Sequence, residues 1–199
     1  MTSDYPKLFK KYYLLLFIIG ILSLLLIIIS KLELIPVALI NNKIITKHEY
    51  ESVATALRNY YKQAEATYLE GDIVKIANDE YELRKETLNY FINKTIIHNE
   101  LKNRLSNNYD KILNNKIENI RKKENFIAAV HTLYSINDSE ITNLVLIPLA
   151  EKELLDGQLF LEKNTIDSWL ENERIKSNVK LFIKGFNWQD GNIEIIKND

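Results

Sequence analysis

An uninterrupted apolar run near the N-terminus places the strongest constraint on how this chain folds. The run extends from Tyr12 to Ile29, holds no charge and no proline, and is interrupted only by Gly20 and Ser23. An α-helix of that length, 18 residues, spans about 27 Å, close to the roughly 30 Å hydrocarbon core of a bilayer. A helix also satisfies its backbone polar groups internally, as the membrane interior demands. The run therefore predicts a transmembrane anchor over residues 12–30.

Charges on either side of the run predict its orientation. Three lysines precede it against one aspartate, whereas the charges directly after it cancel. By the positive-inside rule, residues 1–11 are expected in the cytoplasm and residues 31–199 on the other side. The run is longer than a signal-peptide core and no small-x-small cleavage site follows, which favours an uncleaved signal-anchor. The expected localisation is the cell membrane, as a single-pass protein with an extracytoplasmic C-terminal domain.

Composition excludes several classes of function. After residue 31 the chain carries 22 Lys and Arg against 26 Asp and Glu, and this acidic balance argues against a nucleic-acid-binding face. The chain has no cysteine, which excludes disulfides, thiol catalysis and cysteine-based metal sites. What remains after the apolar run is long enough for one domain with a real apolar core.

Apolar spacing predicts that this domain is mainly helical with a small β element. Residues 37–45 hold two short β-prone runs separated by Asn41-Asn42, and asparagine tolerates the positive φ of a two-residue hairpin turn. Thr46 followed by Glu49 is a capping-box pattern, so a helix is expected to begin there. Gly71-Asp72 and Asn107-Asn108 are expected breaks. Further helices are predicted over residues 79–105, from 109 onward, over 126–134 and over 139–160.

The C-terminal part adds a closing helix and short strands. Asp138 is the expected N-cap of the helix over 139–160, and Pro148 is expected to kink or divide that helix. The pattern then predicts a closing region over 165–196, with an amphipathic helix over 165–175, a strand over 179–183, a turn over 188–191 and a returning strand over 193–196. The first of these strands is expected to pair with the early hairpin.

Motifs for covalent or metal chemistry are missing from the sequence. The three histidines, His48, His98 and His131, form no pair at helical metal-ligand spacing, and no HExxH, GxSxG, SxxK or phosphate-loop motif occurs. His48 is expected to face solvent or contact a helix end, and His98 to be a surface or satisfied core group. A zinc site built from all three would need a fourth ligand. No catalytic residue, metal or cofactor is therefore predicted.

Tyrosines are concentrated on the helix that begins near Thr46 and on the next one. Ordinary core packing is one interpretation. The other is an apolar groove for extended or unfolded polypeptide, because aromatic side chains supply rigid contact area at low entropic cost. The sequence does not separate the two. On the second interpretation, the client-binding residues are predicted to be Tyr50, Leu57, Tyr60, Tyr61 and Tyr68.

The order of motifs resembles a known family. Residues 37–50 read Val-Ala-Leu-Ile-Asn-Asn-Lys-Ile-Ile-Thr-Lys-His-Glu-Tyr, and residues 84–97 read Arg-x-x-x-Leu-x-x-Phe-Ile-x-x-x-Ile-Ile. Together they resemble the N-terminal chaperone domain of the SurA, PpiD and PrsA group of extracytoplasmic foldases. The segment 169–174, followed by the strand-like run from Val179, is similar to the closing helix and strand of membrane-anchored relatives. The usual Asn-Gly of the hairpin turn is Asn41-Asn42 here.

One departure from that group bears on function. Relatives with isomerase activity carry a parvulin domain. Residues 106–164 are too short for one, and the only methionine of the chain, Met1, lies outside that segment. The resemblance therefore implies a membrane-anchored, ATP-independent chaperone for unfolded or newly exported polypeptides that is not an enzyme. The alternatives are a foldase subunit related to peptidyl-prolyl isomerases and a membrane-tethered adaptor protein. The expected partners are client polypeptides and the membrane but no nucleic acid, with a homo-oligomer or a parvulin-bearing partner left open.

Overall fold

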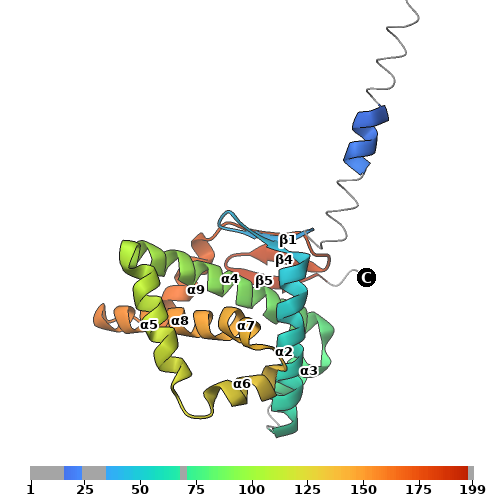
Figure 1. The fold of residues 1–199 in the computed structure, drawn as a ribbon. Helices are drawn as coiled ribbons and strands as arrows, with labels where there is room; N and C mark the ends of the chain where they lie inside the picture. Colours follow the sequence, from blue (N-terminus) through green and yellow to red (C-terminus); the bar gives the residue numbers. More distant parts are fainter. Residues whose placement is uncertain (1–15, 24–34, 68–70, 197–199) are drawn as a thin grey trace, which may run out of the picture.

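The computed structural model (Figure 1) describes residues 16–23, 35–67 and 71–196. Residues 16–23 form a short helix. The later elements, in chain order, are β1 (Pro36–Ile40), β2 (Lys43–Thr46), α2 (Lys47–Thr67), α3 (Gly71–Asn78), α4 (Glu80–Leu105), η1 (Ser106–Asn108), α5 (Tyr109–Arg121), α6 (Phe126–Tyr134), α7 (Asp138–Ile141), η2 (Thr142–Leu146), α8 (Ile147–Leu161), α9 (Ile166–Lys176), β3 (Val179–Leu181), β4 (Phe186–Gln189) and β5 (Asn192–Ile195). The prediction of a mainly helical fold with small β elements is confirmed.

The predicted membrane anchor is not found among the described residues, which include only 16–23 of the segment 12–30. Within the described part of the chain, no helix combines the length and the apolarity needed to cross a bilayer. On this finding the prediction of a transmembrane signal-anchor is wrong, and so is the single-pass cell-membrane localisation derived from it. Residues 12–15 and 24–30 of the predicted anchor lie outside the described residues.

The β elements lie at one end of the molecule, beside α4 and α9 (Figure 1). β1 is the middle strand of an antiparallel sheet ordered β2-β1-β3, with Ala38 opposite Leu181. Asn41 and Asn42 turn the hairpin with φ of 45° and 72°, as a primed turn requires. The predicted hairpin and its pairing with the tail strand are confirmed. The Thr46 Oγ1 accepts from the Glu49 amide at 3.3 Å while a Glu49 carboxylate oxygen accepts from the Thr46 amide at 2.9 Å, which completes the predicted capping box.

Helix α4 runs through the centre of the helical part. It begins at the N-cap Asp79, whose carboxylate accepts from the Tyr81 and Glu82 amides. Its buried side chains recur every three to four residues and contact α2 on one side and α8 and α9 on others. The largest fully buried ones are Leu88, Ile92 and Leu101. A site that uses side chains of α4 is therefore built on the most constrained element of the fold.

Pro148 shapes the neighbouring segment. The predicted helix over 139–160 is instead α7, a π-helical segment η2 and α8, and its N-cap is Asn137 rather than Asp138. In η2 the Ile147 amide donates to the carbonyl of Thr142, five residues earlier. Proline has no N–H. Pro148 therefore donates no hydrogen bond to the carbonyl of Leu144, four residues earlier, or to that of Asn143, five residues earlier.

Replacing two of the glycines with alanine is expected to change stability in opposite directions. Gly191 turns β4 into β5 at φ +81°, and a Cβ on it would lie 3.1 Å from the Ile175 backbone nitrogen. Gly157 lies within α8, where a Cβ would meet nothing within 4 Å. We expect Gly191→Ala to lower the free energy of unfolding by about 1–3 kcal/mol and Gly157→Ala to raise it by about 0.5–1 kcal/mol. Urea denaturation of both variants checks this, and equal effects of the same sign would contradict it.

Candidate functional site

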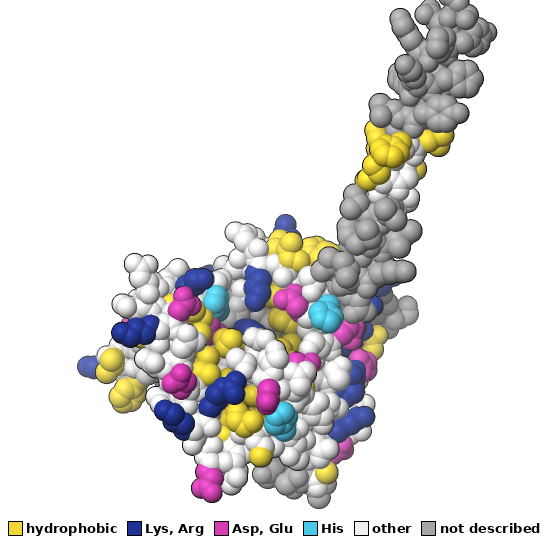
Figure 2. All heavy atoms as spheres, in the orientation of Figure 1, with side chains coloured by type: hydrophobic (Ala, Val, Ile, Leu, Met, Phe, Trp, Pro, Cys, Tyr) yellow, Lys and Arg dark blue, Asp and Glu magenta, His cyan; other side chains and the backbone are white. Residues whose placement is uncertain are grey.

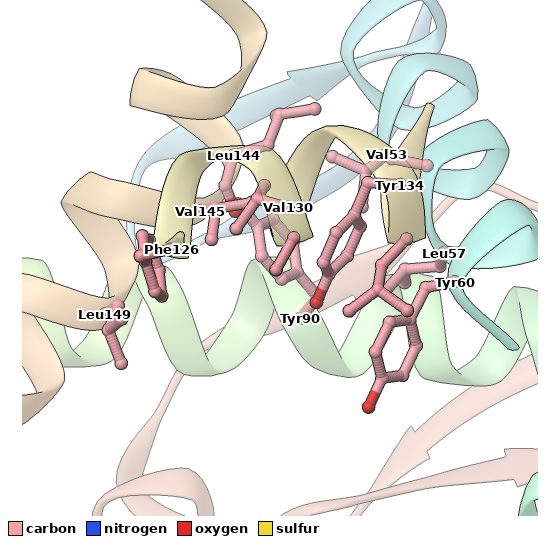
Figure 3. A pocket seen from close by; sticks show the side chains of 13 residues that line it. Val53, Leu57, Tyr60, Tyr90, Phe126, Val130, Tyr134, Leu144, Val145 and Leu149 are labelled. Carbon is pink, nitrogen blue, oxygen red and sulfur yellow. The ribbon is translucent and has the colours of Figure 1, made fainter. Parts of the chain in front are cut away.

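An apolar pocket of about 400 Å³ opens between α2, α4, α6 and the junction of η2 with α8. Its walls are aromatic and aliphatic, with Tyr60, Tyr90 and Tyr134 around one space and Phe126 and Leu149 beyond them (Figure 3). No charged side chain lines it. The face drawn in Figure 2 carries a gathering of hydrophobic side chains near its middle, with charged side chains and histidines around them. A pocket of this size and lining is typical of ligand sites, which are mostly concave and apolar.

The tyrosines of the pocket come from three different helices. The rings of Tyr60 and Tyr134 are stacked with their centroids 5.0 Å apart, and Tyr61 meets Tyr60 edge-on at 5.2 Å. Burial, followed by the Tyr60 hydroxyl, raises the pKa of Tyr134 to about 12. The Tyr134 hydroxyl therefore stays neutral near pH 7, and the pocket presents apolar ring faces with polar atoms at their edges.

The structure separates the five residues that the sequence predicted to bind a client. Leu57 and Tyr60 line the pocket, and Tyr61 packs on Tyr60 without lining it. Tyr50 is only 3% exposed and lies elsewhere, with its hydroxyl 3.5 Å from the carbonyl oxygen of Arg84. Tyr68 lies outside the described residues.

Other lining residues had no local signal in the sequence. Tyr134 ends a helix that lies far from α2 in the chain, and the Asn59 side-chain amide ties that end to α2 by donating to the Tyr134 carbonyl at 3.1 Å. Tyr90 lies on α4 and lines the pocket, where its hydroxyl donates to the Leu144 carbonyl of η2 at 3.0 Å.

A second hollow, the polar cavity, adjoins the pocket and measures about 440 Å³. Residues of β2, α2, α4, α7, η2 and α8 line it, and several of them carry charge or titrate: Lys43, His48, Glu49, Lys94, His98 and Glu151. Val53 and Leu144 line both hollows. The apolar pocket and the polar cavity are thus neighbours that share part of their walls.

A buried carboxylate lies in the wall of the polar cavity. Glu151 is 1% exposed, and its Oε1 lies 2.6 Å from His98 Nδ1 and accepts from the Tyr109 hydroxyl. The Tyr109 oxygen is also 3.1 Å from His98 Nδ1. Glu151 Oε2 is buried and has no hydrogen-bond partner among the described residues. Charged side chains are rarely buried unless they are paired, and the second oxygen of Glu151 is an acceptor without a donor.

Lys94 lines the polar cavity. Its Nζ donates to the Asn143 carbonyl at 2.9 Å and lies 3.4 Å from the Tyr90 hydroxyl, while that hydroxyl donates to the Leu144 carbonyl at 3.0 Å. These carbonyls lie four and five residues before Pro148, which has no N–H to donate to them. Burial, and then repulsion by the Lys43 ammonium, lower the pKa of Lys94 to about 8.

His98 contacts Glu151 and the Tyr109 hydroxyl. Glu151 orients His98, but no serine or threonine hydroxyl is hydrogen-bonded to that imidazole in the described part of the chain, as an activated nucleophile requires. His131 is held by the Ile136 carbonyl and Asp138. The described residues contain no group of three or more His, Cys, Asp or Glu placed to hold a metal ion.

Comparisons with protein-family models, with curated proteins and with solved structures give no match for this chain. The resemblance to the SurA, PpiD and PrsA group therefore stays a prediction from the sequence.

Proposed function

We propose that the protein binds apolar segments of unfolded or newly made polypeptides in the apolar pocket, without ATP and without covalent chemistry. The observation that carries this proposal is the open, uncharged pocket of about 400 Å³ with aromatic walls. Rings supply contact area that tolerates many apolar side chains and loses little conformational entropy on binding. Weak binding and release by dissociation then need no nucleotide.

The direct test measures client binding with a charge placed in the pocket. Leu133 is half-buried and lines the pocket, so we expect Leu133→Glu to weaken binding of a fluorescent apolar peptide by at least about tenfold, since desolvating a carboxylate opposes burial of apolar groups. Suppression of aggregation of a denatured client should fall in parallel. Fluorescence anisotropy and light scattering measure the two effects.

Phe160 provides the matched control. It lies at the end of α8 and is 78% exposed, beside Leu161 at 82%, and neither residue lines the pocket. Phe160→Glu removes an apolar contact of similar size at a distance from the pocket and is expected to leave peptide binding unchanged. Peptide binding that survives Leu133→Glu but is lost in Phe160→Glu would refute the proposal.

The same exposed pair favours a second candidate, an adaptor that docks one fixed partner. Two neighbouring large apolar side chains at one helix end form a small exposed apolar patch of the kind used in protein contacts. Capture of a single stoichiometric partner, abolished by Phe160→Glu and not by Leu133→Glu, would support this candidate over the first.

A further inference from the structure

Two lysines, Lys43 and Lys94, line the polar cavity. Among the described residues, neither forms a close ion pair, and Lys94 Nζ instead donates to the Asn143 carbonyl at 2.9 Å. Of the acidic side chains of the cavity, Glu49 binds the backbone of Thr46, Glu140 accepts from the Asn137 amide at 3.0 Å and Glu151 binds His98 and Tyr109. The attraction of Glu49 and Glu151 therefore offsets only part of the effects that lower the pKa of Lys94. The Lys43 and Lys94 ammoniums repel each other, and this repulsion contributes to the low pKa of Lys94. A ligand that brings negative charge between them would relieve the repulsion.

The same cavity also presents an acceptor. Glu151 Oε2 is buried without a donor. His98 lines the cavity too, with its Nδ1 2.6 Å from Glu151 Oε1. Leaving a buried acceptor unpaired costs free energy. A ligand that suits this cavity therefore combines an anion with a hydrogen-bond donor close to it.

We propose that the polar cavity binds the C-terminal carboxylate of a polypeptide whose apolar side chains fill the adjoining pocket. Lys94 and Lys43 contact the carboxylate, and Glu151 accepts from the last peptide N–H. The shared wall formed by Val53 and Leu144 brings the two ends of such a ligand together. This inference rests on the proposed function and adds to it a preference for free chain ends.

The need for a hydrogen-bond donor beside the carboxylate distinguishes a peptide C-terminus from other apolar acids. A fatty acid has a carboxylate and an apolar chain but no N–H next to the carboxylate, so it would leave Glu151 Oε2 unpaired. A peptide C-terminus supplies the carboxylate and, on the same residue, the N–H of the last amide. Charge-assisted hydrogen bonds of this kind are roughly twice as strong as neutral ones.

The test compares chemical forms of one short apolar peptide by fluorescence anisotropy on the full chain. We expect the free C-terminal acid to bind about tenfold more tightly than its carboxamide. The acid with its last amide nitrogen methylated should bind less tightly than the unmethylated acid, and dodecanoate should compete poorly. Equal affinities of acid and carboxamide would overturn the inference while leaving the proposed function standing. Failure of both peptides to bind would overturn the two together, and dodecanoate competing as well as the acid would overturn the choice of a peptide end.

Two variants test whether Lys94 causes the preference for the free acid over the carboxamide. Lys94→Gln is expected to abolish the difference between acid and carboxamide, whereas Lys85→Gln, on the same helix and outside both hollows, should retain it. Circular dichroism shows whether both variants keep the helical fold. A preference that survives Lys94→Gln in a folded protein would refute the assignment.

A pH series on the unaltered protein gives a second readout. The carboxylate binds the protonated Lys94, whose pKa in the free protein is about 8. The affinity for the acid should therefore fall by about tenfold between pH 7 and pH 9, and that for the carboxamide should not. The carboxamide also reports any effect of the other titratable groups around the cavity, which are Lys43 of β2, His48 and Glu49 of α2, His98 of α4, Glu140 of α7 and Glu151 of α8. Parallel curves for the two peptides would contradict the role of Lys94.

Discussion

Replacing Glu151 with alanine is expected to lower the free energy of unfolding by about 3 kcal/mol. The carboxylate is the acceptor for the hydroxyl of Tyr109, which is 5% exposed, and for the imidazole of His98. The alanine variant leaves both donors without their partner and opens a void between α4, α5 and α8. Urea denaturation monitored by circular dichroism measures the change.

The neighbouring acidic residue on the same helix is the control. Glu153 forms an ion pair with Lys116 at 2.7 Å, and the side chains of both are about one-third exposed. Solvent screens such a pair, so Glu153→Ala should cost less than about 1 kcal/mol. If Glu151→Ala and Glu153→Ala were equally mild, the contacts of Glu151 with Tyr109 and His98 would not stabilise the fold.

Replacing Arg174 with alanine should cost about 2–3 kcal/mol of unfolding free energy. Its guanidinium donates to three oxygens: the Gly191 carbonyl at 2.8 Å, and the side chains of Asn93 at 2.6 Å and Asn89 at 3.0 Å on α4. It also lies 5.1 Å from the ring centroid of Trp188. One side chain thus joins α9, α4 and the β4–β5 hairpin, and burial lowers its pKa.

Two further variants show whether geometry or charge matters at this position. Arg174→Lys keeps the charge but not the planar fork of donors, so we expect it to recover less than half of the loss. Arg58→Ala removes a guanidinium whose ion pair with Glu80, at 3.1 Å, is largely exposed, and it should cost less than about 1 kcal/mol. A fully restored stability in Arg174→Lys would show that charge alone explains the effect.

Local chemistry explains which elements the sequence predicted well. The Asn41-Asn42 turn, the Thr46 capping box and the helix over 126–134 each depend on residues within one or two turns of chain. The tail strand could be placed because a hairpin edge needs a partner. The break expected at Gly71-Asp72 is instead the start of α3, and the turn expected over 188–191 is confined to Asp190 and Gly191.

Long-range packing explains most of what the sequence did not reveal. Glu151 and His98 are 53 positions apart, and neither spacing nor composition indicates that they meet. Tyr134 reaches the pocket only because α6 folds back on α2. The membrane anchor was inferred from apolarity over residues 12–30, and no helix among the described residues is both long and apolar enough to cross a membrane.

The π-helical segment before Pro148 has a geometrical consequence for α8. Each added residue advances a helix by about 100° of azimuth, so one widened turn sets α8 out of phase with α7 by roughly that angle. This rotation determines which face of α8 packs against α4. Glu151 lies on that face, where its carboxylate binds the His98 imidazole and the Tyr109 hydroxyl. The widened turn thus has the effect of one inserted residue, which rotates α8 relative to α7 although the helical segments follow one another directly.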